Sequence, residues 1–363
     1  MKLLHEYAAL DLGTYSAKLL ALQSADGYTY EISDLHESVL PTGMISGGFT
    51  NSMISDQDKF EITLSQLLGK LSRRKAGLIV GLPDRWVKLH LVALQVRAEE
   101  LESRDYLNWR LQKAIGSADK SAELMTDCQV LSTREEGNLL AVKCLVGQVR
   151  KEPVEALSQI LMRLKIPVVA FDTSTLGVFN LLEETHPDLT IDRDLIMCHI
   201  GHETTVVKAF EQGILRYERV IEVGGEAFTS LLAEAENLSL ELAGAEKLKR
   251  AFFPMTREEM VRQIAQRHLF EKVFGNWLRE LTVTFRFYQD KFKVLKIPHL
   301  YLSGGSSLFE GLPEFLSEFF ETTCRRFNPL KELSSSPQPG VDFRTQGPVF
   351  APALGLLVTE GSV

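Results

Sequence analysis

The sequence predicts an α/β protein of two related halves, with a small α+β subdomain inserted in the first half and a helical subdomain in the second. The halves are predicted by two glycine-centred turns, Asp11–Lys18 and Cys198–Val207, each of which separates two apolar strands. A third observation is the glycine pair Gly304-Gly305, which stands between a strand and a helix. The two turns lie about 190 residues apart, which is on the order of one domain for each half.

The first half opens with a strand hairpin whose turn is Asp26-Gly27, a dipeptide that favours tight turns. A helix is expected next, because its apolar residues recur at helical spacing. A buried strand then ends at Pro83. The expected elements are the strands Leu19–Gln23 and Tyr28–Ile32, the helix Phe60–Leu71 and the strand Gly77–Leu82.

The next segment has its own strand-helix-strand-helix pattern, and it lies between two strands that belong to one larger sheet. We therefore expect an inserted subdomain, while further strands of the main sheet remain the alternative interpretation. The last helix carries one apolar stripe. The expected elements are the strand Trp86–Val96, the helix Glu99–Ile115, the strand Leu139–Val146 and the helix Glu152–Leu164, followed by the strand Val168–Phe171.

The second half is expected to begin with a strand and a hairpin, followed by a mainly helical stretch over 230–295 and a return to the sheet. A Ser/Pro/Gly-rich surface loop precedes a last helix of small residues. The expected elements are Leu195–Ile200, Val206–Phe210, Ile214–Val220, a long helix Glu271–Phe292, the strand Ile297–Leu302, the helix Leu308–Leu316, the loop Lys331–Pro348 and the helix Ala351–Leu357.

This pattern divides the chain into four parts. The first core domain comprises 1–82 with 166–190, and the inserted subdomain is 83–165. The second core domain comprises 191–230 with 297–363, and the helical subdomain is 231–296.

Composition excludes several classes of protein. With 363 residues, 45% of them hydrophobic, the chain can bury more than one core. A net charge of -8 without a long basic block argues against nucleic acid as a partner. The four cysteines form no Cys-x-x-Cys pair, which favours reduced thiols in a cytosolic protein without zinc.

The sequence also lacks the patterns of membrane insertion. His5 and Glu6 interrupt the N-terminal apolar residues, and no window approaches 18 uncharged apolar residues. We therefore expect a cytoplasmic protein with no membrane span of its own.

The chemistry of the turns indicates a nucleotide. Glycine allows a backbone to approach an anion closely, and turn N–H groups with Thr and Ser hydroxyls can surround it. A glycine pair between a strand and a helix leaves room for a flat ring against the backbone. Either turn alone is also typical of an ordinary loop, but the three features together predict two halves that close on one nucleotide.

Six short motifs occur in an order that resembles the actin-like ATPase superfamily. Within that superfamily the chain is most similar to the branch that contains FtsA and PilM, and there to the PilM family of type IV pilus assembly proteins. The resemblance covers essentially the whole chain. The motifs are Asp11–Lys18, the hairpin at 199–205, Gly224-Gly225, the pair Glu246 and Lys249, Ser303–Ser306 and Ala351–Gly355.

The resemblance implies two ribonuclease-H-like halves that close on ATP and Mg²⁺, with Asp11 facing the metal. It implies a first phosphate loop of Gly13, Thr14, Tyr15, Ser16 and Lys18, and a second of Gly201, His202, Glu203, Thr204 and Thr205. The nucleoside would be lined by Gly224, Gly225, Glu246 and Lys249, and the adenine by Gly304 and Gly305 with Ser306 beside them.

Two departures from the family pattern bear on catalysis. His199 stands where the family usually has an aspartate, and neutral imidazole is a poor ligand for magnesium. Ser174 stands where an acid is usual, so Asp172 is the one candidate catalytic residue, with an ordinary turn-starting aspartate as the alternative. We expect at most a slow ATPase. A transition-metal site at His199, His202 and Glu203 is not expected.

Two classes of function follow from the resemblance. The first is a scaffold, peripheral at the inner membrane, that binds the N-terminal cytoplasmic tail of a PilN-like pilus protein; pilus motor components are further candidate partners. The groove for the tail would have its walls in Gly81–Val96 and Leu139–Lys165. The second class is an active ATPase or sugar-kinase-like enzyme on the same fold. Filament formation and a secretion-system role also remain open.

Overall fold

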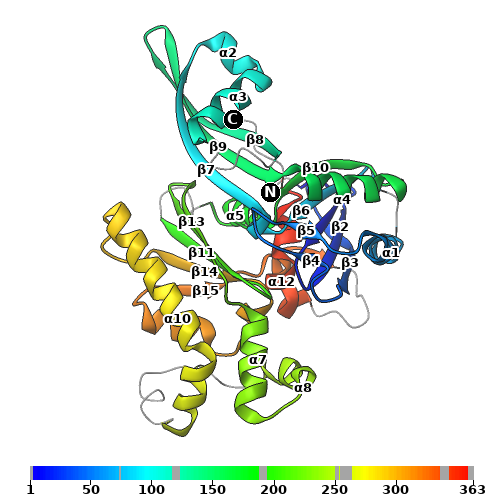
Figure 1. The fold of residues 1–363 in the computed structure, drawn as a ribbon, viewed down its shortest axis with the longest axis vertical. Helices are drawn as coiled ribbons and strands as arrows, with labels where there is room; N and C mark the ends of the chain where they lie inside the picture. The colour runs from blue at the N-terminus through cyan, green and yellow to red at the C-terminus, as the bar shows by residue number, and fades with distance from the viewer. Residues whose placement is uncertain are drawn as a thin grey trace.

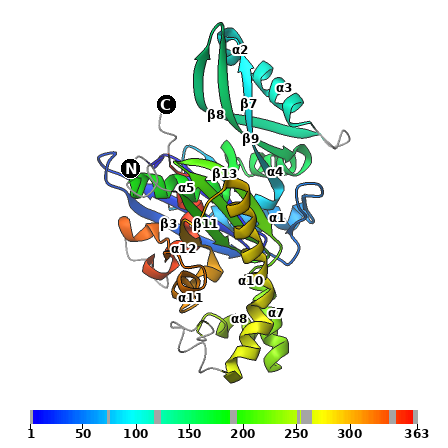
Figure 2. The same cartoon turned by 90° about the vertical axis from the view of Figure 1, so that its left-hand side faces the viewer.

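The computed structural model describes residues 3–72, 75–116, 123–187, 194–249, 253, 264–335 and 343–358. Two sheets lie at the centre of the molecule, one in each half. The inserted segment projects at one end of the long axis, and α7 (Gly225–Glu236) and α8 (Leu240–Glu246) lie at the other end (Figure 1). The turned view shows the insert standing clear of both sheets (Figure 2).

The sheet of the first half runs in the order β10-β6-β1-β2-β3-β16. These strands are β10 (Val168–Thr173), β6 (Leu78–Leu82), β1 (Ala8–Leu12), β2 (Ser16–Gln23), β3 (Glu31–Val39) and β16 (Ser334–Ser335). Alternate residues of β1 face opposite sides, as the period of a strand requires. Leu10 packs with α1 (Gln57–Leu68) and α4 (Lys151–Arg163), whereas Ala9 packs with α5 (Ser174–Thr185) and α12 (Phe343–Gly355).

The sheet of the second half runs in the order β13-β12-β11-β14-β15. Its strands are β13 (Ile214–Ile221), β12 (Thr205–Glu211), β11 (Leu195–Ile200), β14 (His299–Ser303) and β15 (Cys324–Arg326). One face packs on α7, α10 (Ile264–Phe292) and α11 (Leu312–Phe319). The other face contributes Met197 and Phe210 to the core that holds α5 and α12.

Helices α5 and α12 therefore lie between the two sheets and join the halves. The helices cross closely at Gly177 and Gly355, where a Cβ on either glycine would collide with the backbone of the other helix. Phe179 of α5 stacks on Phe210 of β12 with ring centroids 3.6 Å apart. Because these contacts are apolar and buried, the interface between the halves is part of the main core.

The inserted segment forms a sheet of its own in the order β7-β9-β8, so the alternative of further main-sheet strands is wrong for the described residues. Its elements are β7 (Val87–Val96), α2 (Ala98–Glu102), α3 (Arg104–Ile115), β8 (Leu124–Glu136) and β9 (Leu139–Arg150), with a small core between the helices and the sheet. Helix α4 follows, and its apolar stripe packs on the main sheet beside α1. The four-part division of the chain remains a prediction.

Most of the expected elements are present, and the differences have physical reasons. The expected helix Glu99–Ile115 is broken at Ser103, whose hydroxyl caps α3 by accepting from the Tyr106 N–H. Strand β8 was missed because none of its side chains is fully buried and its last five residues are polar and exposed. Helix α12 starts at Phe343, before the expected Ala351, and includes Pro348 and Pro352. The expected loop overlaps 336–342, which lies outside the described residues.

Short elements complete the fold. They are β4 (Ile45–Ser46), β5 (Met53–Ile54), and the 3₁₀ turns η1 (Asp84–Trp86), η2 (Gly305–Leu308) and η3 (Pro329–Glu332). In the described ranges, no helix combines the length and the apolar character that crossing a bilayer requires.

Candidate functional site

The two predicted phosphate loops have the same construction. The Gly13 N–H donates to the Ser16 carbonyl at 3.0 Å, and the Gly201 N–H donates to the Thr204 carbonyl at 2.9 Å. Each loop joins two antiparallel strands of its own sheet. The position two residues before the glycine is therefore equivalent in the halves, so that His199 of β11 corresponds to Asp11 of β1.

The two loops also lie against each other. The Tyr15 and His202 rings meet with their centroids 4.6 Å apart. Tyr15 is nevertheless 46% exposed, so one side of this contact is open to solvent. Residues nearly two hundred positions apart thus face one another across the boundary between the halves, as the sequence predicted.

Charged and hydroxyl groups at the first loop are held in place by one another. Lys18 Nζ lies 3.8 Å from Asp11 Oδ2 and donates to Ser16 Oγ at 3.0 Å, while Ser16 Oγ donates to Glu37 at 2.6 Å. Burial raises the pKa of the Asp11 carboxyl, against the opposing effects of the Lys18 charge and a hydrogen bond with Ser174. The first loop therefore offers one buried carboxyl with a lysine beside it.

The second loop carries no negative charge at the equivalent position. His199 is a half-buried residue near the end of β11, and burial lowers the pKa of its imidazole to about 4. Its Nδ1 lies 3.0 Å from Ser303 Oγ. The imidazole is therefore neutral near pH 7, and no cluster of three acidic, histidine or cysteine side chains able to hold a metal is found in the described part of the chain.

Asp172 and Ser174 lie on the first half near Asp11. Asp172 is exposed at the end of β10, in register with Gly81 and through it with Asp11 two strands away. Its Oδ1 accepts from the Thr173 N–H at 2.6 Å. Ser174 is buried and donates to the Leu82 carbonyl at 3.1 Å. The catalytic role of Asp172 remains a prediction.

Gly224 and Gly225 bring the start of α7 onto the second loop. The Gly225 N–H donates to the Gly201 carbonyl at 2.9 Å, and the Glu226 N–H donates to the His202 carbonyl at 2.7 Å. A Cβ on Gly224 would stand 2.6 Å from the His202 carbonyl oxygen. Gly224 thus permits close packing of α7 on the loop, and the first amides of α7 are already used.

The glycine pair after β14 divides into two different positions. Gly304 has a φ of +87°, and a Cβ there would stand 2.5 Å from the Ile200 carbonyl oxygen. Its N–H donates to the Pro348 carbonyl of α12 at 2.8 Å. A Cβ on Gly305 would meet no heavy atom within 4 Å. Gly304 therefore allows its backbone to pack closely on the end of β11, while Gly305 faces open space.

One lysine at the site was not predicted from the sequence. Lys247 Nζ donates to the Gly225 carbonyl and to Thr229 Oγ1, both at 2.9 Å. The predicted residues Glu246 and Lys249 flank it, and Lys249 is exposed. The spacing of the pair Glu246 and Lys249 predicted Lys249 as a site residue. Because α8 ends at Glu246, helical periodicity does not predict which of the following side chains points towards the second loop.

A buried ion cluster joins the halves beside these loops and was also missed. Lys208 of β12 reaches Asp84 of η1 at 2.6 Å and Glu218 of β13 at 3.0 Å, and it donates to Thr175 of α5. Next to it, Arg85 of η1 pairs with Glu203 of the second loop. The sequence signal that could have predicted this cluster was Lys208, the single charged residue within the apolar strand at 206–210.

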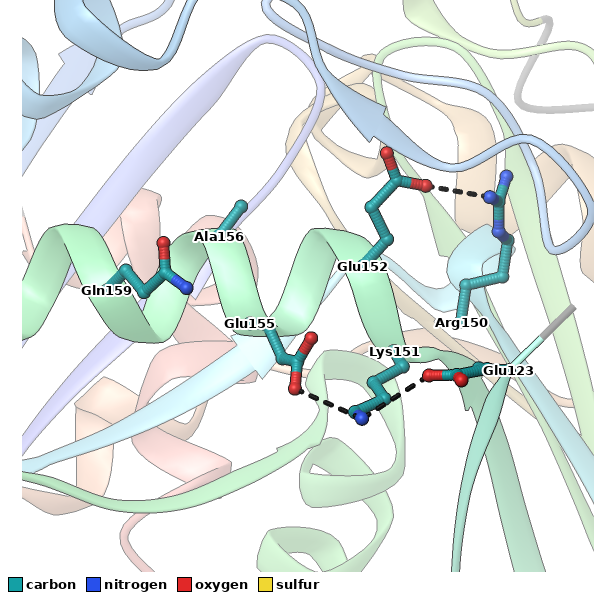
Figure 3. A pocket seen from close by; sticks show the side chains of 7 residues that line it. All are labelled: Glu123, Arg150, Lys151, Glu152, Glu155, Ala156 and Gln159. Carbon is teal, nitrogen blue, oxygen red and sulfur yellow. Dashed lines mark hydrogen bonds and ion pairs between the residues drawn. The ribbon is translucent and has the colours of Figure 1, made fainter.

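A pocket of about 400 Å³ lies where the insert meets α4 (Figure 3). Its lining includes residues of the predicted groove wall Leu139–Lys165 but none of the other predicted wall, Gly81–Val96. Its charged side chains pair with one another: Lys151 lies 3.3 Å from Glu123 and 3.4 Å from Glu155, and Arg150 lies 2.8 Å from Glu152. Ala156 and Gln159 of α4 complete the lining. The pocket is thus polar, and it is lined by residues at the end of β9, by Glu123 before β8 and by α4.

Comparison with known proteins settles the family. A family model described as type IV pilus assembly protein PilM matches residues 9–360. The chain belongs to the PilM family of type IV pilus assembly proteins. The predicted resemblance is thereby confirmed. A comparison with curated protein sequences found no match.

Solved structures confirm the actin-like fold of this PilM-family chain. The structure described as a PilM-PilN type IV pilus biogenesis complex matches with a TM-score of 0.77 at 22% identity, covering 98% of this chain and 99% of that one. The ethanolamine utilization protein EutJ from Carboxydothermus hydrogenoformans matches with a TM-score of 0.52 at 13% identity, covering 97% and 88%. MreB 5 of Spiroplasma citri bound to AMPPNP matches with a TM-score of 0.50 at 11% identity, covering 96% and 94%.

Proposed function

We propose that this PilM-family chain is a nucleotide-binding scaffold of a type IV pilus inner-membrane complex. In this proposal it binds ATP between its halves, hydrolyses it slowly or not at all, and docks the cytoplasmic tail of a PilN-like membrane protein. The observation that carries the nucleotide part is the pair of identically closed loops, which face each other at Tyr15 and His202. Nucleotide in the solved MreB 5 relative supports the same part of the proposal.

The residues present fit ATP better than they fit a tightly held metal. Gly305 faces open space where a base would lie, and the loop amides with Lys18 can offset phosphate charge. Asp11 is the carboxyl that would hold Mg²⁺, which keeps several waters and phosphate oxygens as its other ligands. The metal would neutralise phosphate charge. Because His199 is neutral and Ser174 is a hydroxyl, neither of these two positions offers a carboxylate to orient water, which supports slow hydrolysis.

Docking of a membrane-protein tail is proposed for the pocket between the insert and α4. The paired charges there can exchange partners with a bound peptide, and the solved PilM-PilN complex supports a PilN-like partner. Attachment through such a tail would place the protein at the inner membrane on its cytoplasmic side.

The experiment measures two affinities by calorimetry: that for ATP with Mg²⁺, and that for a peptide of the N-terminal tail of the organism's PilN-like protein. Ala156→Trp fills the pocket from the half-exposed side of α4 and should abolish peptide binding while leaving ATP affinity unchanged. Ala235→Trp on α7, at the opposite end of the molecule (Figure 1), is the matched control. Equal peptide affinity in both variants contradicts the groove, and absence of ATP binding in the wild type contradicts the nucleotide site.

A further inference from the structure

Lys247 is a half-buried lysine whose ammonium group forms no ion pair with a carboxylate of the described residues. Its Nζ is bound by the Gly225 carbonyl and Thr229 Oγ1, which are both neutral acceptors. Among the residues that the structure describes, no Asp or Glu oxygen lies within 4.0 Å of this nitrogen. By contrast, Lys208, which is fully buried where Lys247 is half-buried, has Asp84 and Glu218 as partners.

An unpaired cation in such a place is energetically unfavourable. Transfer of a charge out of water costs several kcal/mol unless an opposite charge or several hydrogen bonds offset it. Burial accordingly lowers the pKa of Lys247 to about 8. An anion bound beside the ammonium would remove this cost, so the free protein is prepared for a negatively charged ligand.

Three sequence segments converge at this ammonium group. A Cβ on Gly225 would stand 3.2 Å from Lys247 Nζ, 2.5 Å from Ser306 Oγ and 3.4 Å from the Gly201 carbonyl oxygen. The lysine therefore lies where the second loop, the start of α7 and the turn after β14 meet. The N–H groups of Gly225 and Glu226 at the start of α7 donate to the second loop and so are not available to an anion. The ammonium group of Lys247 is therefore the donor that offers positive charge at this junction.

We propose that Lys247 Nζ binds a phosphate oxygen of the nucleotide, with Ser306 Oγ beside it as a second donor. The inference rests on the nucleotide site proposed above and assigns one of its contacts. Lys249, which the sequence motif suggested, is exposed and would not make this contact. Adenosine, which has no phosphate, would bind without the help of Lys247.

The test compares ATP, ADP and adenosine by calorimetry with the full chain. Lys247→Met should weaken the binding of ATP and ADP by on the order of 10–100-fold, as expected for loss of a charge-assisted hydrogen bond, and should leave the affinity for adenosine unchanged. Lys247→Arg keeps the charge and should restore most of the affinity. Lys272→Met, at a lysine that pairs with Glu234 at 3.0 Å on the same subdomain, is the matched control and should match the wild type.

A pH series gives a second measurement. Among the described residues, His202 of the second loop is the titratable side chain that interacts with this ammonium, and burial lowers the pKa of its imidazole, so it stays neutral between pH 7.5 and 9. Affinity of the wild type for ADP should fall by on the order of tenfold over this range as free Lys247 loses its proton, whereas Lys247→Arg should show no such fall.

Three results would overturn the inference: equal ADP affinity in Lys247→Met and the wild type, an equal loss for adenosine and ADP, or a loss in Lys249→Met that is absent from Lys247→Met. Each of these requires that the wild type binds nucleotide. If the wild type binds neither ATP nor ADP, the proposed function fails and the inference fails with it, so the two failures are distinguished by the wild-type measurement.

Discussion

Lys208 Nζ lies 2.6 Å from Asp84 Oδ1, and this ion pair connects the sheet of the second half to η1, the turn that comes after β6 of the first half. Lys208 is 1% exposed. Burial by itself would raise the pKa of Asp84 and lower that of Lys208, but their mutual attraction outweighs it, so the pKa of Asp84 is lowered and that of Lys208 is raised. Both groups are therefore charged, and the halves are joined by a polar contact inside an apolar interface.

Lys208→Met should destabilise the protein by about 3–5 kcal/mol, because it leaves Asp84 and Glu218 buried without their cation. Urea unfolding measures the loss. Adding Asp84→Asn to Lys208→Met should recover part of it, since one uncompensated charge is removed. A loss below about 1 kcal/mol in the single variant would contradict the buried character of the pair.

His199 should make stability depend on pH. Its pKa is about 4 in the folded protein, against about 6.5 for an unfolded histidine, so the unfolded chain binds the proton more readily. The contribution of the neutral His199 imidazole to the free energy of unfolding is complete above pH 6.5 and is lost as the pH falls towards 4. The stability of the wild type relative to His199→Asn should therefore fall by about 3 kcal/mol between pH 7 and pH 4, as measured by urea unfolding at each pH. A constant difference would show that the imidazole is solvated.

The two glycines after β14 should respond differently to the same change. Gly304→Val places a side chain at a φ of +87° against the Ile200 carbonyl and should lower the melting temperature markedly. Gly305→Val faces open space, so the protein should fold normally and lose ATP affinity because the side chain occupies the place of the base. Calorimetry that finds unchanged ATP affinity in a folded Gly305→Val protein would contradict the predicted position of the base.

Hydrolysis should be limited by the missing acid of the second loop. His199→Asp restores a carboxylate at the position equivalent to Asp11, and loss of one positioned catalytic group typically costs on the order of 10²–10⁴-fold in rate. Single-turnover hydrolysis of bound ATP should therefore be slow in the wild type and faster in His199→Asp. A fast wild-type reaction, or no gain in either rate or Mg²⁺ affinity from the substitution, would contradict this interpretation.

Arg85 should couple the nucleotide loop to the insert. It precedes β7 and pairs with Glu203 of the second loop and, at 3.2 Å, with Glu222. If ATP changes the affinity for the PilN-like tail peptide, Arg85→Met should reduce that change while both individual affinities remain measurable. The same ATP-dependent change in Arg85→Met as in the wild type would show that this ion pair does not transmit it. Arg104→Met, at the exposed pair with Asp127 within the insert, is the control.

Local sequence determined the elements whose signals are local. Continuous apolar runs predicted the strands β1, β6 and β11, which are buried on both faces, and the helical spacing of apolar residues predicted α1, which buries one face. The glycine turns predicted two matching loops, and their identical closure at Gly13 and Gly201 confirms the expected geometry. His199 was recognised as a departure from an acid through the resemblance to the family pattern.

Contacts between distant segments were decided only by the tertiary structure. No local pattern specifies that Lys208 meets Asp84, or that Lys247 rather than Lys249 turns towards Gly225, because each depends on how two separately formed elements pack. Gly304 and Gly305 are equivalent in sequence, yet one supports the backbone of β11 and the other faces open space. The sequence thus predicted the two loops and the glycine pair from local signals, while packing of the two halves on α5 and α12 decided which side chains meet between them.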